Sequence, residues 1–125
     1  MNNRPLLIVT SLVTMLLFTI HWIQDVQWGL DAASPANFGL VIILLVWLCA
    51  TLIWPDHKAS LIVVGLLSIL STGVTVLHIR GASYLRLAAT EGGLPFVWTL
   101  IMLGAGGAFG FVLAVRGLLA LRKRT

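Results

Sequence analysis

Long apolar runs with few ionisable groups recur along this chain of 125 residues. Each of the four runs is close to the ~20 residues that an α-helix needs to cross ~30 Å of hydrocarbon, and the second run is the shortest. The pattern therefore predicts an all-α fold, a four-helix transmembrane bundle that forms a single integral membrane domain. We expect the spans to cover residues 5–24, 36–54, 59–79 and 94–116, followed by a basic cytoplasmic tail over 117–125.

Proline, glycine and short polar residues mark the ends of the predicted helices. Ser34 and Pro35 predict the cap and the first turn of the second helix, because a serine oxygen accepts from free helical N–H groups and a first-turn proline needs no partner. Asp56 is the expected cap of the third helix, within a connection short enough to make an antiparallel hairpin. The glycines at 92–93 interrupt the chain before the fourth helix, and we expect a short interfacial helix over 82–89.

Composition supports a lipid environment. The chain is 59% hydrophobic and only 10% charged, whereas a soluble domain has about 25% charged residues and about 45–50% apolar ones. No polar remainder is available to enclose four such helices in a larger soluble core. The first run is longer than the 7–15 apolar residues of a signal peptide, so we expect an uncleaved helix. Cys49 is the single cysteine, which excludes an intrachain disulfide and a cysteine-based metal site.

Positive charge is distributed unevenly between the two sides of the predicted bundle. Two basic residues, Arg80 and Arg86, fall on one side. The positive-inside rule therefore predicts that both termini lie in the cytoplasm, and the net charge of +4 indicates contact with anionic lipid rather than with nucleic acid. The other side carries Arg4, Lys58, Arg116, Arg122, Lys123 and Arg124.

Two helices carry a polar stripe that we expect to face the interior of the bundle. Polar side chains in lipid turn inward and form hydrogen bonds across helices, each worth about 0.6 kcal/mol. Both stripes become more polar toward the predicted outer end. The stripe of the first helix comprises Thr10, Thr14, His21 and Asp25, and the stripe of the third comprises Ser68, Ser71, Thr72, Thr75 and His78.

The outer ends of these stripes gather ionisable side chains at similar depth, and several interpretations remain open. His21 and Asp25 are four residues apart and point to one side of their helix. The plainest interpretation is a polar network that pins the loops and binds nothing. A metal site of His21, Asp25, His78 and Glu91 is a second, since two imidazoles with carboxylates suit zinc, iron or copper.

Haem is a third interpretation. His21 and His78 come from two helices and would ligate the iron from both sides, with Arg80 or Arg86 as a partner of the propionates. No C-x-x-C-H attachment motif is present in the sequence. Lipid or small-molecule binding in an outer cleft is a fourth. His57 falls in the predicted cytoplasmic turn, a full membrane away, and cannot join this site.

Small residues recur on the fourth helix. Gly106, Gly110 and Ala114 are spaced by four and form one stripe, which lets another helix approach closely. Packing within the bundle is one use of this stripe. A contact with a membrane-protein partner, or with a second copy in a homo-oligomer, is the other.

Three segments, His21–Asp25 (HWIQD), His78–Gly81 (HIRG) and Phe96–Leu100 (FVWTL), resemble segments of small, uncharacterised bacterial four-helix inner-membrane proteins. The resemblance implies a bacterial inner-membrane protein and no particular activity.

The chemistry of the chain argues against two functional classes. Small multidrug transporters use a carboxylate near the middle of the membrane, whereas Asp25, Asp31, Asp56 and Glu91 all lie at the ends of the predicted spans. No spacing of nucleophile, base and orienting group indicates catalysis. The sequence thus predicts a non-enzymatic accessory or interaction protein, and the alternative is a metal- or haem-binding protein with its site at the outer end.

Overall fold

A computed structural model describes residues 4–31, 34–80, 86 and 88–123. These residues fold into four helices of 15 to 30 residues without a strand, which confirms the predicted all-α fold. The predicted interfacial helix over 82–89 lies largely outside the described residues. The elements are α1 (Arg4–Gln27), the short 3₁₀ turn η1 (Pro35–Asn37), α2 (Phe38–Leu52), α3 (Lys58–Arg80) and α5 (Gly93–Arg122).

Three of the helices are long and apolar enough to cross a membrane, which makes this a membrane protein. Helices α1, α3 and α5 have 24, 23 and 30 residues, or roughly 35–45 Å at 1.5 Å per residue. Helix α5 continues through most of the predicted basic tail, as far as Arg122. Helix α2 has 15 residues, about 22 Å, and is shorter than the span predicted over 36–54.

The start of α2 explains part of this difference. The backbone N–H of Asn37 donates to the carbonyl of Ser34 at 3.0 Å, and this bond closes a 3₁₀ turn in front of the helix. Asn37 is the N-cap of α2, without a side-chain capping bond. The prediction that Ser34 caps the helix was therefore wrong, because its hydroxyl donates instead to Asn37 Oδ1 at 3.1 Å.

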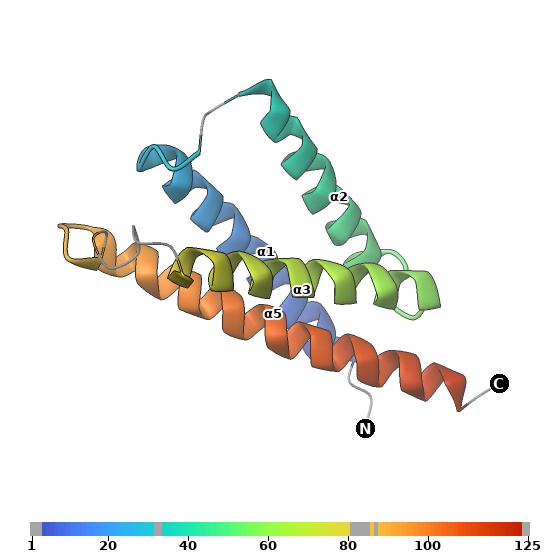
Figure 1. The fold of residues 1–125 in the computed structure, drawn as a ribbon. Coiled ribbons are helices and arrows are strands. Elements are labelled where there is room, and N and C mark those ends of the chain that lie inside the picture. The colour runs from blue at the N-terminus through green and yellow to red at the C-terminus, as the bar shows by residue number, and fades with distance from the viewer. Residues whose placement is uncertain (1–3, 32–33, 81–85, 87, 124–125) are drawn as a thin grey trace.

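One end of the bundle is fixed by an ion pair. Arg4 at the start of α1 contacts Asp56 in the α2–α3 connection at 3.0 Å. Asp56 was predicted as the cap of the third helix, and the structure shows this carboxylate paired with α1 while α3 begins at Lys58. The start of α1 and the α2–α3 connection therefore share one end, which we call the inner end. The C-terminal ends of α1 and α3 lie at the opposite, outer end (Figure 1).

Helices α3 and α5 run side by side in opposite directions, and α1 crosses them and packs on α5 (Figure 1). The seam between α3 and α5 is tight because glycines remove side chains from it. A methyl group on Gly107 would lie 2.6 Å from the Ser68 carbonyl oxygen, and one on Gly104 would lie 2.8 Å from Thr75. The close approach lets the Thr75 hydroxyl donate across the seam to the Leu100 carbonyl at 2.9 Å.

The stripe predicted on the fourth helix also faces its neighbours within the chain. A methyl group on Gly106 would meet Thr14 of α1 at 2.7 Å, and one on Gly110 would meet Ser68 of α3 at 2.8 Å. Ala114 is fully buried and packs near Gly65 of α3. The stripe therefore serves packing inside the bundle, whereas a contact with a partner or a second copy stays a prediction.

Helix α2 is docked mainly by its C-terminal half. Trp47 is 1% exposed, and its indole N–H donates to the Ser11 hydroxyl at 2.7 Å. Ser11 also shares a hydrogen bond with Thr51 at 2.7 Å. Toward its start, α2 leans away from α1 (Figure 1), and its first turn carries the strongly exposed Phe38.

The polar stripes predicted on the first and third helices do face the interior. Their hydroxyls mostly donate to carbonyls four residues earlier on the same helix, as Thr14 does to Thr10. The bonds that cross between helices join α3 to α5 and α1 to α2. The buried members of the two stripes are Thr14, His21, Ser68, Ser71 and Thr75.

Candidate metal centre

Two helices bring three potential metal ligands together at the outer end of the bundle. His21 and Asp25 are one turn apart near the end of α1, and His78 lies near the end of α3. The interaction of α1 and α3 with α5 places these helix ends side by side. The outer cluster, as we call His21, Asp25 and His78, joins the ends of the two predicted polar stripes.

The three side chains converge on one carboxylate oxygen. Nε2 of His21 and Nε2 of His78 each lie 3.4 Å from Oδ2 of Asp25. The two imidazole rings meet edge to face, with their centroids 4.7 Å apart. One ligand atom from each residue can be chosen so that all three lie within 4.8 Å of one another.

The backbone orients one of the imidazoles. Nδ1 of His78 lies 2.9 Å from the carbonyl oxygen of Val74. Because a carbonyl only accepts, Nδ1–H is the donor of this contact, and Nε2 is the nitrogen that faces Asp25. Metal-binding histidines are held in the same way, with one ring N–H donated to a carbonyl and the other nitrogen left for the ion.

His21 lacks such a partner. Its side chain is buried, and neither ring nitrogen has a hydrogen-bond partner within the part of the chain that the structure describes. Oδ1 of Asp25 is buried and unpartnered in the same way. A charge-assisted hydrogen bond would bring nitrogen and oxygen to about 2.7–2.9 Å, whereas these atoms stand at 3.4 Å. The cluster thus leaves hydrogen-bonding capacity unused, and buried groups of this kind need an explanation such as a bound ion.

An aromatic ring from the first turn of α5 covers the cluster. The Phe96 ring lies 5.2 Å from His21 and 6.2 Å from His78 between centroids, and it is almost fully buried. Sequence reasoning did not assign Phe96 to the site. Its position three residues after Gly93, at the predicted outer end, is the sequence signal that could have placed it near the histidines.

The other predicted members do not join the group. Glu91 and Arg80 are both exposed and lie outside it. His57 is exposed in the α2–α3 connection at the inner end, as predicted. The three remaining residues thus form a smaller site than the four-residue metal site that we predicted.

The geometry does not suit haem held by both histidines. Such a haem needs a flat porphyrin plane between the two rings, whereas here the rings touch edge to face and a carboxylate oxygen stands 3.4 Å from both Nε2 atoms. Arg80 is exposed. The three ligand atoms are close enough to one another to hold a single ion.

Comparisons with protein-family models, with curated proteins and with solved structures find no match to this chain. The resemblance to bacterial four-helix inner-membrane proteins therefore stays a prediction.

Proposed function

We propose that this chain is a small multi-pass protein of a bacterial inner membrane that binds one divalent transition-metal ion through His21, Asp25 and His78. The observation that carries the proposal is the convergence of two imidazole nitrogens on one carboxylate oxygen, with His21 otherwise unpartnered. The predicted accessory role is compatible with such a site.

The separations between the carboxylate oxygen and the two imidazole nitrogens suit a tetrahedral ion. Two atoms that each lie ~2.0–2.2 Å from zinc at the tetrahedral angle are about 3.4 Å apart. Both Nε2 atoms stand at that distance from Asp25 Oδ2. A rotation of the His21 ring, whose nitrogens are bound to nothing else described, would close the site. Three protein ligands leave the fourth position for water or for an external donor.

The chemical nature of the three ligand atoms determines which metal ions the site prefers. Two imidazoles and one carboxylate suit zinc, iron(II) or cobalt(II), whereas magnesium and calcium prefer oxygen ligands throughout. The ion would also tie the end of α1 directly to the end of α3. Both helices otherwise pack mainly against α5.

Charge supports the orientation. Arg4, Lys58, Arg116 and Arg122 belong to segments at the inner end, and the positive-inside rule puts such an end in the cytoplasm. The metal centre would then face the periplasmic side.

Metal binding tests the proposal directly. Protein purified in detergent is depleted of metal with a chelator, titrated with Co²⁺, and monitored for the visible absorption bands of tetrahedral cobalt. We expect one ion per chain. For His21→Ala and for Asp25→Asn the affinity for cobalt should fall by more than about 100-fold. Mutation of a residue that only hydrogen-bonds to a metal ligand already lowers metal affinity by about 10–100-fold, and loss of a ligand itself should cost more.

His57→Ala is the matched control, since it removes an exposed histidine at the opposite end and should bind cobalt as the wild type does. The proposal fails if the wild type takes up neither Co²⁺ nor Zn²⁺, or if His21→Ala binds as tightly as His57→Ala. A Soret band in the purified protein would favour haem instead.

A further inference from the structure

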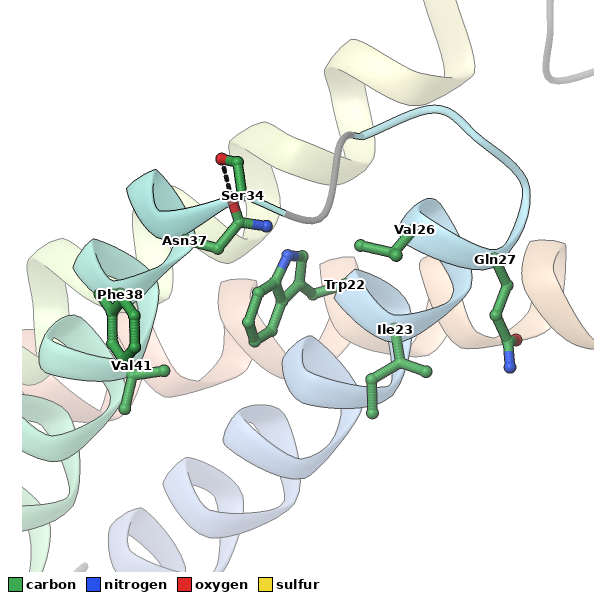
Figure 2. Close-up of a pocket in the computed structure, with 8 residues that line it drawn as sticks. All are labelled: Trp22, Ile23, Val26, Gln27, Ser34, Asn37, Phe38 and Val41. Atoms are coloured by element: carbon green, nitrogen blue, oxygen red, sulfur yellow. Dashed lines mark hydrogen bonds between the residues drawn. The ribbon is translucent and has the colours of Figure 1, made fainter.

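A pocket of about 410 Å³ opens between the last turns of α1 and the first turns of α2 (Figure 2). This volume falls within the ~300–1,000 Å³ typical of small-molecule sites. None of the outer cluster residues lines it. The pocket is lined by Trp22, Ile23, Val26, Gln27, Ser34, Asn37, Phe38 and Val41.

Two hydrogen-bond donors of the lining lack an acceptor. The indole Nε1 of Trp22 and the amide Nδ2 of Asn37 are buried and have no hydrogen-bond partner among the described residues. The Ser34 hydroxyl donates to Asn37 Oδ1 at 3.1 Å, which turns the N–H groups of the amide away from Ser34. In Figure 2 the two nitrogens face the same end of the pocket.

These donors define what the pocket recognises. A buried tryptophan N–H normally finds an acceptor, and a carbonyl oxygen has two lone pairs, enough to accept from both nitrogens. The described lining residues include no ionisable side chain, so the part of a ligand that enters should carry no charge. The rest of the lining is largely apolar, with Phe38 and Val41 on the α2 side (Figure 2).

We propose that this pocket binds the ester end of a membrane lipid's acyl chain. The ester carbonyl oxygen accepts from Trp22 and Asn37, and the first methylene groups lie against Phe38, Val41 and Ile23. The proposal is independent of the metal centre.

The position of the pocket favours a lipid over other neutral carbonyl compounds. It lies at the outer end of two apolar helices, between the last turns of α1 and the first turns of α2, where α2 leans away from α1 (Figure 1). The ends of membrane-spanning helices reach the polar interface of a bilayer, which is the level of the lipid esters. The two buried donors without a described acceptor lie close together in Figure 2, and the other amide of the lining, Gln27, is exposed. One ester carbonyl oxygen is enough to accept from both buried donors.

Photolabelling tests this proposal. Protein in mild detergent is titrated with a phosphatidylcholine that carries a diazirine close to the ester carbonyl of one acyl chain, then irradiated, digested and mapped by mass spectrometry. Saturable labelling is expected in the segments 22–27 and 34–41. Phosphatidylglycerol with the same chain should label equally, because the lining carries no charge.

Two variants separate a built site from general lipid contact. Trp22→Phe keeps an aromatic ring and removes the N–H, and should weaken labelling about fivefold, the equivalent of one hydrogen bond. Val41→Trp should fill the pocket and abolish labelling. The control Val9→Trp lies on the same helix as Trp22, at a site 58% exposed, and should label as the wild type does. Far-ultraviolet circular dichroism and thermal unfolding in detergent report whether each variant is folded.

Three results would overturn the proposal. The first is equal labelling of the wild type, Trp22→Phe and Val41→Trp when circular dichroism shows all three to be folded. The second is strong preference for phosphatidylglycerol, which would indicate recognition of the headgroup. The third is displacement of the lipid by a short-chain ubiquinone at a lower concentration than unlabelled lipid requires, which would assign the pocket to a quinone.

Discussion

The seam between α3 and α5 differs from the outer end of α1 in whether buried polar atoms have hydrogen-bond partners. In the seam, the hydroxyls of Ser71 and Thr75 donate to carbonyls of their own helix or of α5. At the outer end, the buried side-chain atoms that lack a partner include both ring nitrogens of His21 and Oδ1 of Asp25. All such atoms found in the described residues belong to 21–25 and 37.

The contrast separates the part of the molecule that holds the fold from the part available for binding. Burying a polar group without a partner costs about 1–3 kcal/mol, and the core of a bilayer has little water that could form the missing hydrogen bond. A structure that satisfies the seam and leaves one end unsatisfied therefore concentrates binding capacity at that end. The predictions below test this division, beginning with the largest expected effect.

Zinc should stabilise the fold through the outer cluster. At a free concentration a hundredfold above its dissociation constant, an ion that binds only the folded state adds about 2.7 kcal/mol to the free energy of unfolding. We expect thermal unfolding of the wild type in detergent to shift upward with Zn²⁺, and unfolding of Asp25→Asn to stay unchanged. Mg²⁺ should have little effect on either protein. If Zn²⁺ raised the unfolding temperature of both proteins equally, the ion would bind somewhere other than the outer cluster, and the contrast between the two regions would not hold.

Gly107→Ala should damage the seam. The added methyl would stand 2.6 Å from the Ser68 carbonyl oxygen, which cannot swing away as a side chain does. Overpacking of this kind costs about 1–3 kcal/mol, to be measured as a fall in the unfolding midpoint in detergent. Gly73→Ala on α3 is the control, because nothing lies within 4 Å of its added methyl, and alanine favours a helix by up to about 1 kcal/mol. Equal loss of stability in both variants would show that the seam is not tight.

Two tryptophans differ in the same way, because one indole N–H has a hydrogen-bond partner and the other has none described. The Trp47 N–H donates to Ser11 at 2.7 Å, whereas the Trp22 N–H has no described acceptor. Trp47→Phe should therefore cost about 1 kcal/mol of unfolding free energy beyond Trp22→Phe, the net worth of one hydrogen bond. The comparison is made in lipid-free detergent, where Trp22 has no lipid carbonyl to lose. A larger loss for Trp22→Phe would show that its N–H is satisfied in the protein.

The sequence predicted the helices and the outer cluster because both depend on local patterns. Apolar runs set the number of helices, and His21, Asp25 and His78 sit where those runs end. The i, i+4 spacing of the first two makes their meeting a property of any helix. We expected His78 to join them because it lies at a similar depth in the bundle. In the structure the ring centroids of His21 and His78 are 4.7 Å apart.

The features that the sequence did not predict depend on how the helices pack against one another. Helix α5 carries small residues on several faces, and only its neighbours determine that Gly104 and Gly107 make close contacts with α3. The 3₁₀ turn that delays the start of α2 looks in sequence like an ordinary cap and first turn. The unpartnered donors of Trp22 and Asn37 depend on the lean of α2, which no local pattern encodes.

The smallest effect should come from the inner end, where the contact is polar, partnered and in water. The side chains of Arg4 and Asp56 are 48% and 65% exposed, and exposed ion pairs contribute about 0–1 kcal/mol. Asp56→Asn should lower the unfolding midpoint only slightly at low salt, and by still less at high salt, because added ions screen exposed charges. Binding of Co²⁺ at the opposite end should be unaffected. A change in cobalt affinity would mean that the two ends are coupled through the bundle, and the division into a structural part and a binding part would then fail.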